Sequence, residues 1–202
     1  RVEIHRGVVR LDTDYGLLKA RADARLADGR LMAMDAQLDP AALKGEGLAA
    51  RLGEVSLRLA TTRGRVDLLL TAPVEALEAQ GFKAQGGRVR LSVQGPYPDT
   101  VRKRGEGRVM ARLEASAARA TLGQDGLDEM RLVANFDGAT RGWIETLVLE
   151  GDGDLQVGAC GGQVAGFTLA GLTGQASLGD VRWTRAAGDV VWPTLMHLLS
   201  YG

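Results

Sequence analysis

The chain has 202 residues, which is enough for one large domain or two small ones with a buried hydrophobic core. Its 25 basic and 25 acidic residues cancel, so no net field favours nucleic acid, and we expect no nucleic-acid partner. A single cysteine, Cys160, excludes an intrachain disulfide, and with only two histidines the chain cannot assemble the usual Cys/His zinc shells. We therefore expect neither a metal nor a cofactor.

No window approaches the roughly 18 uninterrupted apolar residues that a membrane-spanning helix needs. The chain begins at Arg1, without an initiator methionine or the charge pattern of a signal peptide. We expect residues 1–202 to form a single β-rich domain that is a piece of a longer protein. Any targeting or anchoring segment would then lie outside it.

Apolar and polar residues alternate from the start of the chain, as is typical of antiparallel strands with one face in water. Residues 9–13 show this pattern first. Residues 16–29 show it almost without error, with charged residues at every other position. Their apolar side consists of Leu18, Ala20, Ala22, Ala24 and Leu26. After Asp28-Gly29 the pattern continues over 32–38, as expected for the next strand of a hairpin.

Three further stretches, 55–60, 66–70 and 89–93, continue the alternation, and turn-like sequences that contain glycine separate them. Their apolar sides consist of Val55, Leu57, Leu59, Val66, Leu68, Leu70, Val89, Leu91 and Val93. Residues 130–136 and 144–148 alternate in the same way. The regular succession of strand and turn argues against long crossover helices, so we expect an all-β antiparallel meander.

Only a few short helices are expected. Residues 71–82 place Val74 and Leu77 three apart, between a proline near the start and a glycine near the end, which predicts about two helical turns. Residues 39–47 predict one further turn after an Asp-Pro pair. In the tail, 190–202, a helix is expected to follow a Trp-Pro pair.

Three segments rich in glycine or alanine admit two interpretations each. Residues 106–123 fit a helix face or a strand, and we favour the strand because the neighbouring segments are strands. Residues 150–154 carry two aspartates, but no third ligand and no glutamate complete a calcium loop, so we interpret them as a tight acidic turn. The glycines of 161–168 lack the lysine of a phosphate-binding loop and indicate turns.

The sequence contains no catalytic motif. G-x-S-x-G does not occur, and His5 and His197 lie at opposite ends of the chain, so both are interpreted as core or capping residues. Cys160 has no basic residue near it in the sequence to lower its pKa and is predicted to be a buried strand thiol. We expect no enzymatic activity. A basic run is either a solvated loop or a contact for anionic headgroups or a partner protein: Arg102, Lys103 and Arg104.

The apolar sides of the strands are aliphatic. They consist of Ala, Val, Leu and Met, and the whole chain has only three Phe. A second sheet packed on such a face normally contributes larger side chains, aromatics often among them. Two architectures therefore stay open: a β-sandwich with an aliphatic core, which composition alone slightly favours, or an open sheet whose smooth face suits flexible acyl chains.

One segment, "HRGVVRLDTDYGLLKARADARLADGRL" at 5–31, resembles a pattern of alternating hydrophobic residues around T-x-x-G that recurs in the AsmA-like envelope proteins, of the TamB and YdbH type. Residues 53–70 and 127–153 are similar in style. The smaller N protein of type II secretion, which resembles the same group, is a related candidate. The likeness covers most of the chain but rests on alternation and glycine placement, with no invariant motif.

This resemblance implies a long, curved antiparallel β-meander whose open, apolar groove shelters lipid acyl chains in the periplasm, with the membrane anchor outside this chain. It implies a part in phospholipid or lipid transport between the inner and outer membranes, or in envelope biogenesis. The partners would be acyl chains, other envelope proteins and further segments of the same chain. The alternative is a structural assembly subunit of an envelope or secretion machine, with a closed protein core.

Overall fold

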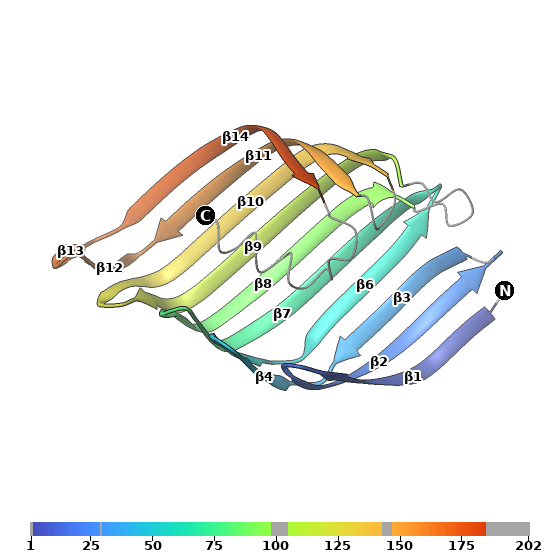
Figure 1. Ribbon diagram of the computed structural model, residues 1–202, viewed down its shortest axis with the longest axis horizontal. Helices are drawn as coiled ribbons and strands as arrows, with labels where there is room; N and C mark the ends of the chain where they lie inside the picture. Colours follow the sequence, from blue (N-terminus) through green and yellow to red (C-terminus); the bar gives the residue numbers. More distant parts are fainter. Residues whose placement is uncertain (1, 29, 98–104, 143–146, 185–202) are drawn as a thin grey trace.

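The computed structural model describes residues 2–28, 30–97, 105–142 and 147–184, and all the strands of this part belong to one antiparallel sheet (Figure 1). The described residues contain no helix. The strands are β1 (Val2–Thr13), β2 (Gly16–Ala27), β3 (Arg30–Leu38), β4 (Ala41–Gly45), β5 (Leu48–Leu52), β6 (Val55–Thr62), β7 (Arg65–Ala79), β8 (Phe82–Pro96), β9 (Gly107–Leu122), β10 (Asp125–Arg141), β11 (Val148–Ala159), β12 (Gly161–Val164), β13 (Phe167–Leu169) and β14 (Leu172–Thr184).

The sheet is a simple meander once interrupted strands are joined. β11 and β12 both pair with β10 in one continuous register, since Arg131 lies opposite Gly158 and Asp128 opposite Gly161. The same relation joins β3 to β4, β5 to β6, and β13 to β14. The sheet therefore consists of ten antiparallel passes, each beside the next in the sequence, with β1 at one edge and β14 at the other.

A transverse bend, which we call the crease, crosses every pass from β3–β4 to β13–β14. Ala117 and Ala120 of β9 are three residues apart, yet they pack into one cluster with Leu77 and Met130. In a regular strand, residues three apart point to opposite faces, so each pass shifts its phase by one residue at the crease. The residues at this shift are 39–40, 53–54, 75–76, 85–86, 118–119, 128–129, 160–161 and 170–171.

The closest packing in the sheet lies beside the crease. The buried apolar residues are Leu43, Ala50, Ala84, Val109, Ala117, Ala120 and Ala159, and all except Val109 lie within a few residues of it. Because these small side chains share one face, the sheet bends toward that face. No large side chain among the described residues is fully buried, and no second sheet of this part of the chain covers the first. The fold is the predicted open meander rather than the alternative β-sandwich.

Two helix predictions are wrong. Residues 71–82 belong to the hairpin of β7 and β8, and residues 39–47 contain β4. The spacing of Val74 and Leu77, which indicated a helical face, is the phase shift at the crease. The strand preferred for 106–123 is confirmed as β9, whereas the predicted tail helix lies outside the described residues.

Some glycine-rich segments are turns and others are not. Arg63-Gly64, Gln80-Gly81 and Ala165-Gly166 adopt positive φ at both residues, which forms the tight hairpin turns expected at such positions. By contrast, 150–154 is not a turn but lies within β11. Glycine there permits close contact, because a Cβ on Gly151 would lie 2.4 Å from the backbone oxygen of Asp137.

Candidate functional site

All fourteen residues predicted to form the apolar side of the sheet lie on one face, which we call the aliphatic face. The register carries rows of side chains straight across the strands. One row, continuous from edge to edge, is Gly7, Ala22, Ala36, Leu57, Leu70, Leu91, Leu113, Ala134, Leu155 and Ala176. The neighbouring row is Ile4, Ala24, Met34, Leu59, Leu68, Val93, Ala111, Phe136, Gly153 and Leu178.

The aliphatic face is wider than the sequence predicted. The predicted residues lie on β2, β6, β7 and β8, whereas the rows continue over β1, β3, β9, β10, β11 and β14. Alternation in 32–38 and 130–136 pointed to β3 and β10, and these residues could have been included on that signal. The phenylalanine in the rows, Phe136, lies opposite Ala111 and Gly153, so small neighbours make room for its ring.

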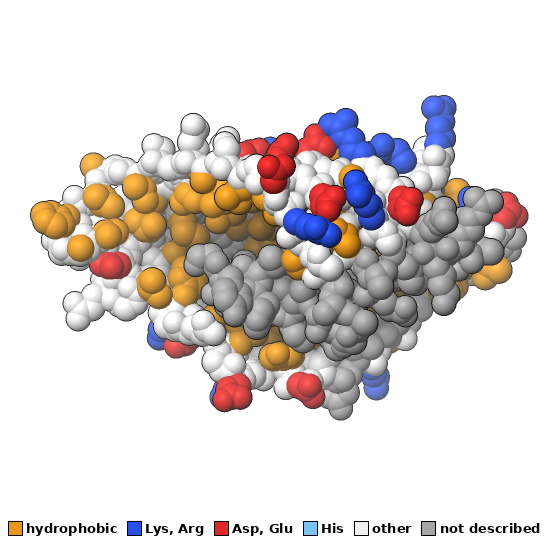
Figure 2. Space-filling view, turned by 45° about the horizontal axis from the view of Figure 1, so that its top comes forward, with side chains coloured by type: hydrophobic (Ala, Val, Ile, Leu, Met, Phe, Trp, Pro, Cys, Tyr) orange, Lys and Arg blue, Asp and Glu red, His pale blue; other side chains and the backbone are white. Residues whose placement is uncertain are grey.

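Side chains of the aliphatic face remain partly open. Along β2 the burial alternates strictly, with half-buried positions on the aliphatic side and exposed positions on the other. In Figure 2 hydrophobic side chains gather in a hollow of the molecule, and charged side chains lie along its margins. No second layer of the described residues covers the aliphatic face. Soluble proteins rarely expose contiguous apolar patches of more than a few hundred Å², and such patches mark binding sites.

The opposite face, which we call the outer face, carries the charged side chains and is exposed to solvent. Cross-strand ion pairs occur there, among them Arg25 with Glu3, Arg58 with Asp35 and Arg108 with Asp137. Arg108 holds the pKa of Asp137 below its ordinary value through a hydrogen bond to the carboxylate. These pairs are exposed, so each contributes little to the stability of the sheet. Their main effect is on sidedness: the charged residues keep the outer face in water, so the apolar residues lie on the opposite face.

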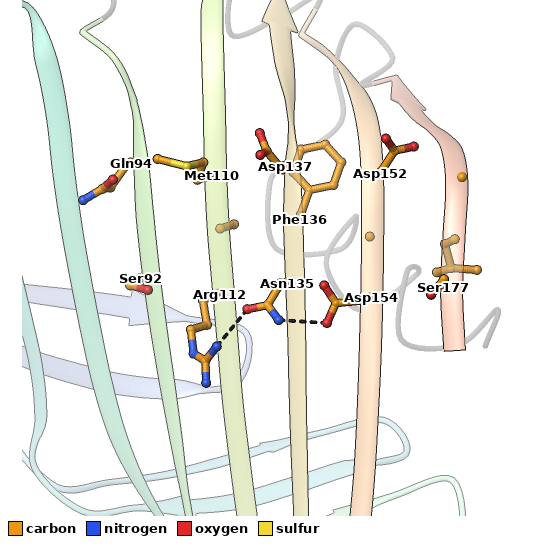
Figure 3. Close-up of a pocket in the computed structure, with 14 residues that line it drawn as sticks. Ser92, Gln94, Met110, Arg112, Asn135, Phe136, Asp137, Asp152, Asp154 and Ser177 are labelled. Atoms are coloured by element: carbon orange, nitrogen blue, oxygen red, sulfur yellow. Dashed lines mark hydrogen bonds between the residues drawn. The ribbon is translucent and has the colours of Figure 1, made fainter. Parts of the chain in front are cut away.

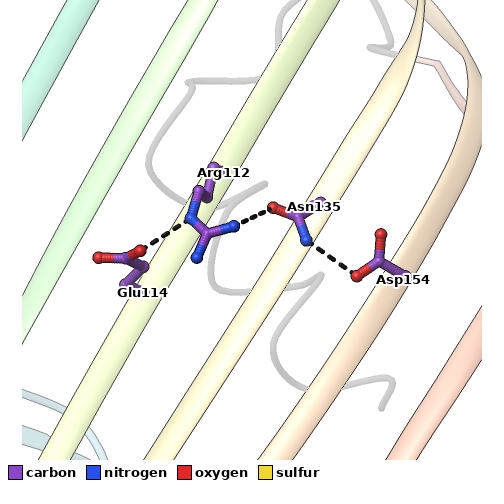
Figure 4. A network of polar contacts seen from close by, with 4 residues as sticks. All are labelled: Arg112, Glu114, Asn135 and Asp154. Carbon is purple, nitrogen blue, oxygen red and sulfur yellow. Dashed lines mark hydrogen bonds and ion pairs between the residues drawn. The ribbon is translucent and has the colours of Figure 1, made fainter.

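A polar network links three strands of the outer face (Figure 4). Arg112 donates to Glu114 at 2.7 Å and to Asn135 at 3.1 Å, and Asn135 donates to Asp154 at 2.8 Å. The hydrogen bond from Arg112 is the main cause that lowers the pKa of Glu114, with further contributions from the charges of Arg90 and Arg131. The network crosses β9, β10 and β11 and fixes their side chains relative to one another. Sequence reasoning missed it because it depends on cross-strand register.

The network borders a polar depression of about 640 Å³ on the outer face, over β8 to β14 (Figure 3). The labelled residues that line it from the outer face are Ser92, Gln94, Met110, Arg112, Asn135, Asp137, Asp152, Asp154 and Ser177, and Phe136, which is also labelled, belongs by register to the aliphatic face. The carboxylates here are already engaged: Asp137 with Arg108, Asp154 with Asn135, and Asp152 with the backbone N–H of Asp180. The polar groups of the depression therefore already satisfy one another, and the apolar side chain that the outer face adds to them is Met110.

The prediction that Cys160 is a buried thiol is wrong, because Cys160 is exposed at the crease, between β11 and β12. Its thiol donates a hydrogen bond to the carboxylate of Glu129, and this contact, together with the negative charge of Glu129, raises the pKa of Cys160. Residues at the phase shift point outward from the crease, and Cys160 is one of them. For that reason Cys160 is exposed rather than buried.

Replacing Glu129 with glutamine is expected to lower the pKa of Cys160 and to speed alkylation of the thiol near pH 8, because the thiolate is the reacting form. Alkylation rates with iodoacetamide across a pH series check this. The rate profile of Glu129→Gln should move to lower pH, and an unchanged profile would contradict the assigned contact. Asp128→Asn, one residue away, is the matched control.

The basic run of Arg102, Lys103 and Arg104 lies outside the described residues. Within the part that the structure describes, no group of three or more His, Cys, Asp or Glu side chains is placed to hold a metal ion. The same part has no helix long and apolar enough to cross a membrane.

The fold and the two unlike faces define a class: a single-layer antiparallel meander, bent across its strands, with one aliphatic and one charged face. Comparisons with protein-family models, with curated proteins and with solved structures find no match for this chain.

Proposed function

We propose that the aliphatic face binds the acyl chains of lipids, and that the chain serves in the periplasm as a segment of a lipid-carrying envelope protein. The observation that carries this proposal is the uninterrupted set of aliphatic rows from β1 to β14, with no second layer from the described residues upon it. The resemblance of residues 5–31 to AsmA-like proteins supports the same function and supplies the location.

The dimensions of the aliphatic face suit a long chain molecule. Ten passes spaced by about 4.8 Å extend the rows over roughly 43 Å across the strands. The rows contain Ala, Val, Leu, Ile and Met with one Phe and two Gly, so they offer a smooth surface without polar side chains. An acyl chain lying along a row meets only apolar side chains and glycine.

Binding would be passive. Removing a methylene from water contributes about 0.8 kcal/mol when burial is complete, and an open face covers one side of the chain, so about half of that is expected. Because the binding free energy is the sum of many weak contacts along a row, no single residue is essential for binding. Headgroups would remain at the margins, where the charged side chains lie, and Arg102, Lys103 and Arg104 are proposed contacts for them. No catalytic step is part of this function.

The proposal is tested by extracting lipid from protein purified without detergent after expression in the periplasm of a Gram-negative host. Mass spectrometry of the organic extract is expected to find diacyl lipid in proportion to protein. Titration of the delipidated protein with a fluorescent fatty acid should show saturable binding. Protein that carries no acyl lipid and takes up no fatty acid would overturn the proposal.

A further inference from the structure

The sheet has two unpaired edges. Among the described residues no strand lies beyond β1 or beyond β14. Of the nine exposed large apolar side chains of the described residues, five lie in these two strands: Val2 (59% exposed), Ile4 (47%) and Val8 (66%) in β1, and Leu172 (40%) and Leu178 (55%) in β14. The row of backbone N–H and C=O groups at such an edge is a template for another strand.

The first part of β14 lacks the residues that usually protect an edge strand. From Leu172 to Gly179 it has no proline, no lysine and no other charged residue. Natural edges avoid pairing with a second chain through such residues, β-bulges, short strands or inward-pointing charges, and the bulge and the charges of β14 lie beyond Leu178. β14 has 13 residues, which is long for an edge strand. The sequence of β14 therefore favours pairing.

β1 of a second copy matches β14 in direction and length. The sheet has ten antiparallel passes, so its first and last strands run in opposite directions, and β1 placed beside β14 continues the antiparallel order. β1 has 12 residues. β14 begins at Leu172 next to the crease, whereas β1 ends at Thr13, beyond the level of the crease, which reaches β1 near Arg10. We take the register that places Thr13 opposite Leu172, because it sets the two strands side by side over their whole length.

This register matches the two strands along their whole length. It places Gly7 opposite Leu178, Ile4 opposite Val181 and Val2 opposite Trp183, and all of these belong to the aliphatic face. β1 has a bulge between Ile4 and Gly7, and β14 has one between Leu178 and Val181. The two bulges fall opposite each other, so the ladder stays in phase on both sides of them.

The proposed register also brings opposite charges together. Glu3 and Arg182 fall opposite each other on the outer face. Within one copy Glu3 already approaches Arg25, and Arg182 approaches Glu150. Pairing of the two edges would join these pairs into one alternating line of charge, and opposite charges directly across a strand pair are favourable.

We propose that β14 of one copy pairs with β1 of a second copy, antiparallel and head to tail, so that the aliphatic face continues from one copy into the next. The contact joins two different surfaces, so copies of the sheet of residues 2–184 add head to tail into linear oligomers rather than a closed dimer. The proposal concerns the edges and does not depend on what the aliphatic face binds.

The test is a disulfide across the proposed contact. Val8 and Ser177 are exposed, and the register places them opposite each other on the outer face. Opposite Cα atoms in an antiparallel pair lie about 4.5–5.5 Å apart, which suits a disulfide. Val8→Cys with Ser177→Cys, in a Cys160→Ser background, should give a ladder of covalent multimers on mild oxidation. Within one copy the two positions lie at opposite edges and cannot join.

The control is Val8→Cys with Thr173→Cys in the same background, because Thr173 lies four residues, or about 13 Å, from the matched position. It should stay monomeric on a denaturing gel. Light scattering of the unchanged protein should show mass rising with concentration. A constant monomer mass with no ladder would overturn the proposal, and so would equal linking of both cysteine pairs, which would mean contact without this register.

Discussion

Replacing both Leu57 and Leu68 with aspartate is expected to strip the chain of bound lipid while the sheet stays folded. Leu57 lies opposite Leu70, and Leu68 lies between Leu59 and Val93, so the two carboxylates would enter the two central rows of the aliphatic face. An acyl chain across them would have to remove water from a charge, which costs several kcal/mol. A loss of about 2.7 kcal/mol corresponds to roughly 100-fold weaker binding.

The measurements are lipid per protein in the organic extract and the dissociation constant for a fluorescent fatty acid. The matched control is Ser56→Asp with Ser92→Asp, which adds two carboxylates to the outer face, on β6 and on β8, the strands on either side of β7. Circular dichroism should show strand signal in both proteins. Unchanged lipid content in the Leu57→Asp, Leu68→Asp protein would remove the aliphatic face from the proposed function, and equal loss in the control would point to damage of the sheet.

Alternation of apolar and polar residues was enough to predict the strands on one side of the crease, such as β2, β3 and β6, and the sidedness of the sheet there. In β2 the predicted apolar residues, Leu18 to Leu26, are the half-buried ones, because a strand with one wet face must repeat every two residues. The meander could also be predicted, since glycine-containing turns lie between successive strands, whereas composition left open whether a second sheet covers its apolar face. The likeness to AsmA-like proteins suggested the same architecture, and no family match bears on it.

The crease could not be predicted from one sequence. A phase shift within a strand places apolar residues three apart, as in Val74 and Leu77, and the same spacing defines one face of a helix. The length of the segment did not distinguish a helix from a strand with a phase shift, because the segment around each shift is short. The strand is favoured over the helix because neighbouring passes shift their phase at positions that lie opposite each other. Ala84 and Ala120 therefore lie beside Leu77. Cross-strand register carries that information.

The far half of the aliphatic face was missed for a related reason. In β10 and β11 glycines occupy several positions in the rows, such as Gly138 and Gly153, so the hydrophobic alternation weakens just where the face continues. These glycines looked like turn residues in the sequence. In the structure they allow backbones to approach where side chains would collide, as for Gly138 beside the carbonyl of Glu150.

Replacing Gly87 with alanine is expected to destabilise the sheet strongly. A Cβ at this position would lie 2.3 Å from the backbone oxygen of Ser116, and neither backbone can yield without opening the β8–β9 ladder beside the crease. Overpacking of this kind costs about 3 kcal/mol, which for a chain of this length lowers Tm by roughly 6–12 °C. Thermal unfolding followed by circular dichroism measures it.

Gly174→Ala provides the matched control, because it adds the same methyl group to the aliphatic face of β14, where no heavy atom lies within 4 Å of the new Cβ. Its stability should stay within about 0.5 kcal/mol of the parent chain, with a small gain from the stiffer unfolded chain. If the crease holds the sheet in its bent form, the two alanines must differ. Equal Tm for both variants would mean that β8 and β9 are not in close contact at Gly87, and that the bend does not depend on glycine.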